Sequence, residues 1–178
     1  RVHTAAGSWN PTSGTFAPVR KLPVYTRQHF PESVLGANAP SATKAGTTVQ
    51  EDESMRLWTL DGDVLIASIK TKMHAIGGGV IEGLNTAIAL AEKEYQGLVI
   101  WSPDDVFSAG ANLESLLPVF MKSGAKGIAP IVKELQDTML RLRYANVPVV
   151  SAIRGLALGG GCELAVHSAR RVVHMESY

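Results

Sequence analysis

The chain has 178 residues, with 17 lysines and arginines against 16 aspartates and glutamates, and a formal net charge of +1. This balance gives no indication of a nucleic-acid partner, and the length suits one domain with an appendage. Hydrophobic residues make up 46% of the sequence, and no apolar run approaches the roughly 20 residues of a membrane span. Cys162 is the only cysteine, which excludes an internal disulfide and favours a reducing compartment, here the cytoplasm.

The N-terminal part differs in amino-acid composition from the rest of the chain. Residues 1–53 contain five prolines, are rich in Gly, Ser, Thr and Ala, and show neither a helical nor a strand period. We expect residues 1–53 to be a proline-rich linker or arm and residues 54–178 to be a folded domain. The chain begins at Arg1 and stops at Tyr178, soon after a strand-like run, so we expect a piece of a longer polypeptide.

Regular secondary structure is expected to begin at about Arg56. Apolar runs at 57–60 and 63–69 flank Asp61-Gly62, and this pattern predicts a β-hairpin. After three glycines at 77–79, apolar residues at helical spacing predict a helix that ends near Lys93. These positions are Val80, Ile81, Leu84, Ala87, Ile88 and Ala91.

The remaining elements alternate in type. They are a strand at 98–101, a loop at 102–112, helices at 113–122 and 128–144, a strand at 149–153, a glycine turn with a helix to Val166, and a strand at 171–175. The second of these helices has apolar positions at Ile128, Ile131, Val132, Leu135, Met139 and Leu142. The order of strands and helices predicts an α/β fold with parallel crossovers.

Two strand-to-loop junctions are candidates for chemistry. Residues 107–112 and 159–163 both follow a predicted strand, where open α/β sheets bind ligands. Both offer small residues with accessible backbone N–H groups, and two such donors aimed at one oxygen form an oxyanion hole. Glu163 falls in the first turn of the following helix.

Each feature also has a purely structural explanation. A glutamate in the first turn often serves the helix dipole, and Gly159–Gly161 would also allow close strand–helix packing. We expect Cys162 to be a small buried residue, and His74 and Asn112 to fix their loops. No glycine-rich dinucleotide fingerprint follows a strand and no metal ligands cluster, so neither site is predicted within this chain.

Two segments carry a family resemblance. Ser108–Asn112 and Gly155–Ala165 resemble the two signature segments of the crotonase (enoyl-CoA hydratase/isomerase) family, and Thr71–Ile76 resembles its first coenzyme A-binding loop. His74 stands where Asn is frequent in the family. Together with the proline-rich arm, residues 73–78 look most like the subgroup fused to a 3-hydroxyacyl-CoA dehydrogenase, with the dehydrogenase first and the hydratase second. The implied fold is crotonase-like, a spiral of ββα units, of which residues 54–178 represent the N-terminal half.

The resemblance implies roles for individual residues. The backbone N–H groups of Ala111 and Gly160 hold the thioester carbonyl oxygen, and Glu163 is the base that orients and deprotonates water. The implied ligand-binding residues are Met73, Ala75, Ile76, Gly110, Asn112 and Gly159. A second family carboxylate, which protonates C2, lies beyond Tyr178, so we expect this chain alone to be inactive or nearly so.

The same resemblance implies a function in fatty-acid β-oxidation. The substrate is a coenzyme A thioester, an enoyl-CoA or acyl-CoA, and NAD is required only by the absent dehydrogenase domain. No metal is expected, and the complete protein is expected to form oligomers. The alternatives are a Δ3–Δ2 enoyl-CoA isomerase, which shares the oxyanion hole, and a non-catalytic acyl-CoA-binding or assembly module.

Overall fold

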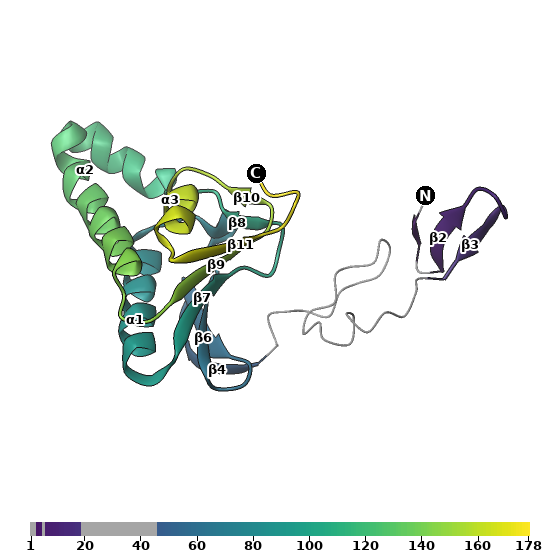
Figure 1. Cartoon of the computed structure of the whole chain (residues 1–178). Helices are drawn as coiled ribbons and strands as arrows, with labels where there is room; N and C mark the ends of the chain where they lie inside the picture. Colours follow the sequence, from purple (N-terminus) through teal and green to yellow (C-terminus); the bar gives the residue numbers. More distant parts are fainter. Residues whose placement is uncertain (1–2, 5, 19–45) are drawn as a thin grey trace. The chain divides into compact units, whose positions relative to one another are not determined.

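The computed structural model describes residues 3–4, 6–18 and 46–178. They belong to two compact units, Arg1–Ala45 and Gly46–Tyr178 (Figure 1). Residues 19–45 of the linker or arm expected over residues 1–53 lie outside the described residues. The boundary between the units falls at 45/46, earlier than the 53/54 expected from composition.

The first unit contains a small antiparallel sheet. Its strands are β1 (His3–Thr4), β2 (Gly7–Asn10) and β3 (Thr15–Ala17), in the order β1-β2-β3. Trp9 lies opposite Phe16 across β2 and β3, with ring centroids 5.3 Å apart in an edge-to-face arrangement. Such a cross-strand aromatic pair stabilises a short hairpin. These strands fall within the segment expected to be an extended arm, and each is too short to show a period in the sequence.

The second unit is built on a six-stranded sheet of order β11-β9-β7-β6-β5-β4. The strands are β4 (Thr47–Glu51), β5 (Met55–Thr59), β6 (Val64–Ile69), β7 (Gly97–Trp101), β9 (Val149–Ile153) and β11 (Arg170–Val173). β4, β5 and β6 are antiparallel neighbours, whereas β6, β7, β9 and β11 run parallel. The hairpin predicted at Asp61-Gly62 is confirmed by the pairing of Met55 with Ile69.

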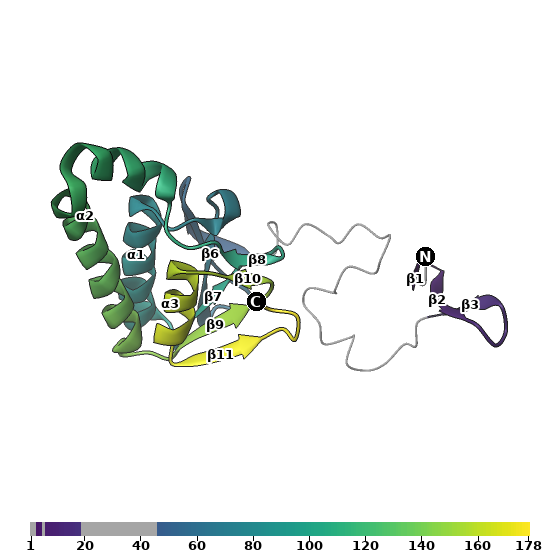
Figure 2. The same ribbon diagram turned by 90° about the horizontal axis from the view of Figure 1, so that it is seen from above.

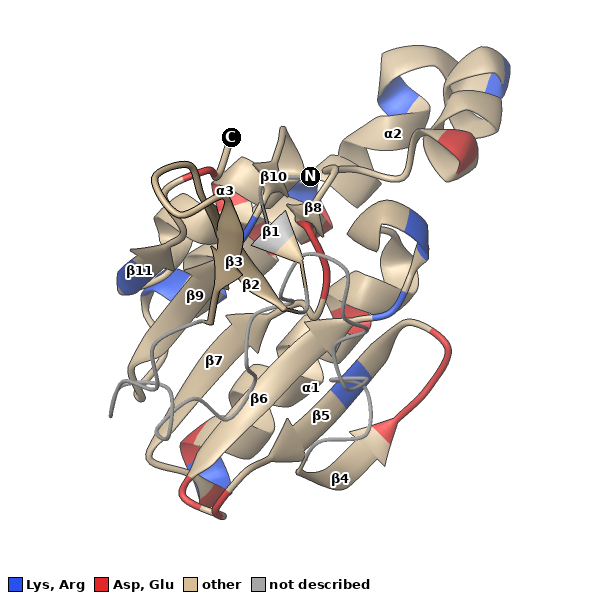
Figure 3. Ribbon diagram, turned by 90° about the vertical axis from the view of Figure 1, so that its right-hand side faces the viewer, with Lys and Arg blue, Asp and Glu red and all other residues tan. Residues whose placement is uncertain are grey.

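The central strands contain no charged residue. β6, β7 and β9 are drawn without blue or red in Figure 3, and the charges lie mainly in loops, helices and outer strands. Five consecutive residues of β6 are buried, so both faces of this strand are covered, whereas buried and half-buried residues alternate along β9. By contrast, all five residues of β4 are exposed, so this strand has no apolar alternation and was not predicted.

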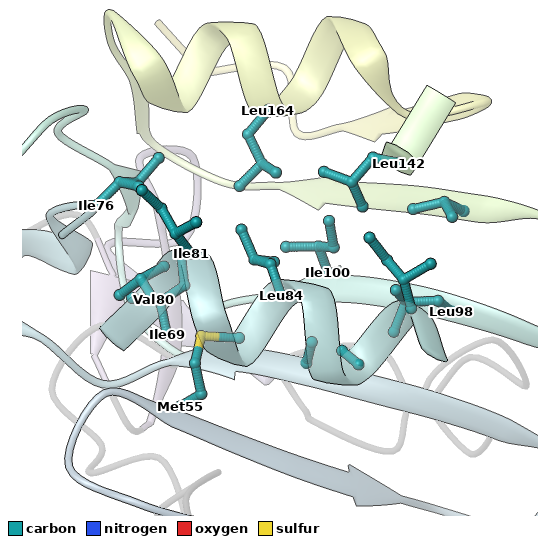
Figure 4. Packing of buried hydrophobic residues seen from close by; sticks show 14 of the residues in the cluster. Met55, Ile69, Ile76, Val80, Ile81, Leu84, Leu98, Ile100, Leu142 and Leu164 are labelled. Atoms are coloured by element: carbon teal, nitrogen blue, oxygen red, sulfur yellow. The ribbon is translucent and has the colours of Figure 1, made fainter. Parts of the chain in front are cut away.

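The helices α1 (Gly78–Glu94), α2 (Leu113–Arg143) and α3 (Gly160–His167) lie on one side of this sheet (Figure 2). All six apolar positions predicted for the first helix are buried, as expected. Leu84 is fully buried and lies among Ile100, Leu142 and Leu164, which come from β7, α2 and α3 (Figure 4). The core therefore joins the sheet to all three helices.

Helix α2 combines the two helices predicted at 113–122 and 128–144. The break lies at Gly124, whose φ of 60° and ψ of −155° are not helical. Of the apolar face predicted for its second part, Met139 and Leu142 are buried, whereas Val132 is 40% exposed. The remaining positions, Ile128, Ile131 and Leu135, are half-buried, and Leu135 packs against the core, so the predicted periodicity is right and the face is partly covered.

The predicted loop at 102–112 contains a short strand, β8 (Val106–Ser108), which pairs in parallel with β10 (Leu156–Ala157). Neither strand was predicted, because neither is long enough to show alternation. This two-stranded sheet brings residues 109–111 close to residues 158–160, the two junctions that the sequence marks as candidates for chemistry.

We predict that Leu84→Ala lowers the free energy of unfolding by about 2–5 kcal/mol, because it removes methyl groups from a close-packed core. Chemical denaturation measures this change. The matched control is Leu117→Ala, since Leu117 is 60% exposed and its truncation should change stability by less than about 0.5 kcal/mol. Equal effects at the two positions would contradict the core described here.

Candidate functional site

A parallel bridge sets the direction of the Ala111 N–H group. Ile76 N–H donates to the Gly110 carbonyl at 2.7 Å, and Asn112 N–H donates to the Ile76 carbonyl at 2.8 Å. In a bridge of this kind the residue between the two bonded neighbours turns its own N–H and C=O away from the partner. The N–H of Ala111 therefore points away from Ile76.

The turn that precedes α3 lies directly beside this loop. A Cβ atom at Gly160 would lie 3.5 Å from the Ala111 nitrogen and 3.7 Å from the Gly110 Cα. Because N and Cβ of one residue are about 2.5 Å apart, the nitrogens of Ala111 and Gly160 lie within about 6 Å of each other. The two candidate donors predicted from sequence are thus brought together.

Neither donor makes a hydrogen bond within the described part of the chain, although Gly160 itself is buried. Gly160 is the first residue of α3, and the first N–H groups of a helix have no partner within the helix. Two neighbouring free donors at a loop–helix junction are the arrangement that stabilises a developing oxyanion.

Ser108 ties the three segments of the site together. It is fully buried, and its hydroxyl donates to the His74 carbonyl at 2.7 Å and accepts from Gly110 N–H at 3.1 Å. Its own carbonyl accepts from Leu158 N–H at 2.9 Å. Sequence reasoning missed this role, because a buried serine in a short strand gives no signal of its own.

Glu163 lies one turn after Gly160 on the same helix. Its side chain is exposed, and its carboxylate has no hydrogen-bond or ion-pair partner among the described residues. His167 contacts the backbone carbonyl of Glu163, through Nδ1 at 2.7 Å, and not the carboxylate. The carboxylate therefore makes no capping hydrogen bond with its own helix, and its position in the first turn suits the helix dipole as well as a role as a base.

The other predicted residues divide into two groups. Ile76 and Gly159 adjoin the two donors, since Ile76 bridges to Ala111 and Gly159 immediately precedes Gly160, and Met73 and Ala75 lie on the same 71–76 loop as Ile76. Asn112 has a structural role, since its side chain accepts from Ser115 N–H and caps α2. Cys162 is exposed, so the expectation of a buried cysteine is wrong. It lies on the solvent side of α3, whose buried face is formed by residues such as Leu164 and Ala165.

An apolar hollow of about 320 Å³ begins next to Asn112. It lies on the first part of α2 and across the break at Gly124, and it was not predicted. Its lining residues are Leu113, Leu116, Leu117, Phe120 and Ile128.

Among the residues the structure describes, no group of His, Cys, Asp or Glu side chains could hold a metal ion. Every described helix is too short or too polar to cross a bilayer.

Residues 65–177 match the Enoyl-CoA hydratase/isomerase family, so the chain belongs to this family and the predicted resemblance is confirmed. It is 35% identical over 128 residues to a putative fatty acid oxidation complex trifunctional enzyme of Rickettsia felis, covering 72% of this chain and 18% of that protein. It is 30% identical over 130 residues to a probable 3-hydroxyacyl-CoA dehydrogenase of Bacillus subtilis, covering 73% and 16%.

Solved structures show the same fold. An enoyl-CoA hydratase from Polaromonas sp. JS666 matches with a TM-score of 0.64 and 25% identity, covering 69% of this chain and 49% of that one. An enoyl-CoA hydratase/isomerase from Xanthobacter autotrophicus Py2 matches with a TM-score of 0.65 and 21% identity, covering 72% and 48%. The expected crotonase-like α/β fold is confirmed, and the chain spans about half the length of these solved relatives.

We predict that Gly110→Ala destabilises the protein more than Gly62→Ala. Both glycines have nearly the same φ, 94° and 96°, so both substitutions pay a similar conformational cost. A Cβ at Gly110 would also lie 2.7 Å from the Leu158 carbonyl, whereas none of the surrounding atoms lies within 4 Å of a Cβ at Gly62. The free energy of unfolding of both variants is measured with a chemical denaturant, and the difference between them reports the close approach of the two loops. Equal losses of stability would contradict that close approach.

Proposed function

We propose that this chain forms the N-terminal half of an enoyl-CoA hydratase domain that binds a 2-enoyl-CoA thioester. The observation that carries the proposal is the pair of free, neighbouring N–H groups on Ala111 and Gly160, with the exposed Glu163 one turn further along the same helix. The thioester carbonyl oxygen accepts from both donors. The match to the Enoyl-CoA hydratase/isomerase family supports this assignment.

The proposed chemistry is addition of water across the C2–C3 double bond. Hydrogen bonds from Ala111 and Gly160 withdraw electrons from the carbonyl, which makes C3 electrophilic. Glu163 accepts a proton from water as the water oxygen bonds to C3, and the electron pair of the double bond moves to form an enolate. One oxyanion donor contributes about 3–4 kcal/mol to such a step, and a general base contributes roughly 10²–10⁴-fold.

The enolate must then receive a proton at C2. By the family resemblance, the carboxylic acid expected for this step corresponds to a position after Tyr178. The proposed mechanism therefore assigns only Glu163 to this chain. Accordingly, the chain carries the two donors and one of the two carboxylates.

The coenzyme A moiety is proposed to pass along the 71–76 loop. Met73, Ala75 and Ile76 lie on this loop, and Gly110, Asn112 and Gly159 lie on the two segments that face it. Met73 is 49% exposed, so its side chain is accessible to a ligand. The substrate is the coenzyme A thioester itself, and none of these roles requires a metal.

We infer a larger arrangement from the relatives. In a longer protein, residues 1–45 would connect this domain to a preceding 3-hydroxyacyl-CoA dehydrogenase domain, which would bind NAD and oxidise the hydration product. The names of the Rickettsia felis and Bacillus subtilis relatives support this arrangement. We place the longer protein in fatty-acid β-oxidation in the cytoplasm, as an oligomer.

Two other functions use the same donors. A Δ3–Δ2 enoyl-CoA isomerase also needs an oxyanion hole but moves a proton between C4 and C2 without adding water. A non-catalytic acyl-CoA-binding or assembly module would need the donors alone. The role of the Glu163 carboxylate separates the hydratase from the binding module, because binding does not require a base.

We predict that Glu163→Gln in the longer protein lowers kcat for hydration of crotonyl-CoA by roughly 10²–10⁴-fold, because the amide cannot accept the proton from water. KM should change little, since the donors remain. The control is Glu82→Gln, on the exposed face of α1, which should behave as wild type. Unchanged turnover in Glu163→Gln would favour the binding module.

We further predict that the isolated 178-residue chain does not hydrate crotonyl-CoA at a measurable fraction of the rate of the longer protein, because the acid that protonates C2 is absent. The measurement is the loss of absorbance of the conjugated thioester. A cooperative unfolding transition recorded on the same sample serves as the control for folding. Hydration at the rate of the longer protein would show that this chain contains the complete catalytic set.

A further inference from the structure

His74 combines burial with an unfavourable backbone conformation. Its side chain is 6% exposed, and both His74 and its neighbour Met73 have positive φ values, 49° and 55°. Residues with a Cβ seldom adopt this conformation, and two in succession persist only where surrounding contacts hold them. Contacts with the neighbouring segments must therefore hold this loop in place.

The imidazole ties the loop to the start of β8. Its Nδ1 makes a short hydrogen bond with the backbone carbonyl of Val106, and it lies 3.6 Å from a carboxylate oxygen of Asp104. A carbonyl can only accept, so Nδ1 carries the proton in this contact. The nitrogen that contacts Val106 is thus engaged within the protein and does not face a substrate.

The backbone carbonyl of His74 is linked by hydrogen bonds to the loop that carries the Ala111 donor. This carbonyl accepts from the Ser108 hydroxyl, which in turn accepts from the N–H of Gly110. Gly110 immediately precedes Ala111, so Ser108 holds the peptide before the one that carries the Ala111 N–H, and the bridge to Ile76 holds that next peptide through the Gly110 carbonyl. A short chain of hydrogen bonds thus runs from the His74 carbonyl through Ser108 to the loop that carries one oxyanion donor.

We propose that His74 is a positioning residue for the oxyanion hole. Its imidazole holds the 71–76 loop against β8, so that the His74 carbonyl orients Ser108 and Ser108 orients the Gly110–Ala111 segment. The proposal rests on the proposed function of the site, because it assigns His74 to the donor that binds the thioester. His74 itself does not touch the substrate.

The chemistry of the contact predicts which substitutions preserve it. The amide nitrogen of asparagine is separated from Cα by the same number of bonds as Nδ1 of histidine, and asparagine tolerates the left-handed region. His74→Asn therefore keeps both the donor and the backbone. His74→Ala keeps neither, and His74→Gln moves the donor one bond further from Cα.

The experiment uses the longer protein that contains this chain, with crotonyl-CoA as the probe. The carbonyl stretch of the bound thioester is measured by infrared difference spectroscopy, together with kcat and KM. In His74→Ala the stretch should move back toward its value in solution, and kcat should fall by about 10- to 100-fold with little change in KM, since a misplaced group can cost about 10² in rate. His74→Asn should restore the wild-type frequency, and His74→Gln should not.

The matched control is Thr138→Ala. Thr138 is also buried, and it accepts from Asn85 at 2.8 Å and donates to the Glu134 carbonyl at 2.9 Å between α1 and α2. It lies outside the proposed site, so its loss should lower stability without moving the carbonyl frequency. If His74→Ala fails to fold, the comparison of His74→Asn with His74→Gln still tests the contact.

Hydrogen exchange separates the two hypotheses. If the wild-type protein neither hydrates crotonyl-CoA nor lowers its carbonyl frequency, the proposed function is wrong, but faster exchange of the Gly110 amide in His74→Ala would still show that His74 holds the Gly110–Ala111 segment in place. If the wild type is active and His74→Ala shows the same frequency and the same Gly110 exchange, the positioning role is wrong. It is also wrong if His74→Asn behaves as His74→Ala does.

Discussion

The contact between two glycine-containing loops is the constraint on which the site depends. Gly110 and Gly161 lie where a side chain would collide with the facing backbone, since their Cβ atoms would approach the carbonyl oxygens of Leu158 and Ser108 to 2.7 and 2.5 Å. Only at this separation do the nitrogens of Ala111 and Gly160 become neighbours. The β8–β10 pair and the Ser108 hydrogen bonds maintain that separation. The hydrophobic core between the sheet and the three helices holds these segments in place.

The sheet and the first helix could be predicted because their signals are strong and local. The Asp-Gly turn between apolar runs and the helical spacing from Val80 to Ala91 each correspond to observed elements. β4, β8 and β10 could not be predicted, for two different reasons. β4 is exposed along its whole length, and the other two have three and two residues, too few for a period.

The site was predicted less completely than the fold. The junctions that contain Ala111, Gly160 and Glu163 could be marked as candidates because glycine-rich segments after strands and a first-turn carboxylate are evident in the sequence, and the family resemblance implied the individual roles. Ser108 and the hydrogen-bonding of His74 could not be found in this way, since they depend on which loop lies opposite. The exposure of Cys162 was also mispredicted, because on a short helix the buried face is chosen by the neighbouring elements, and here Leu164 and Ala165 occupy it.

The parallel arrangement of β7 and β9 has a consequence for how the protein folds. Ala111 and Gly160 are about fifty residues apart in the sequence, and the whole of α2 lies between them. They meet only after this long crossover closes and the parallel pairing of Leu98 with Val149 forms. Contacts of such high sequence separation form slowly, because loop closure costs entropy before the pairing compensates for it. We therefore expect the N–H groups of Ala111 and Gly160 to become neighbours late in folding, after the local helices have formed.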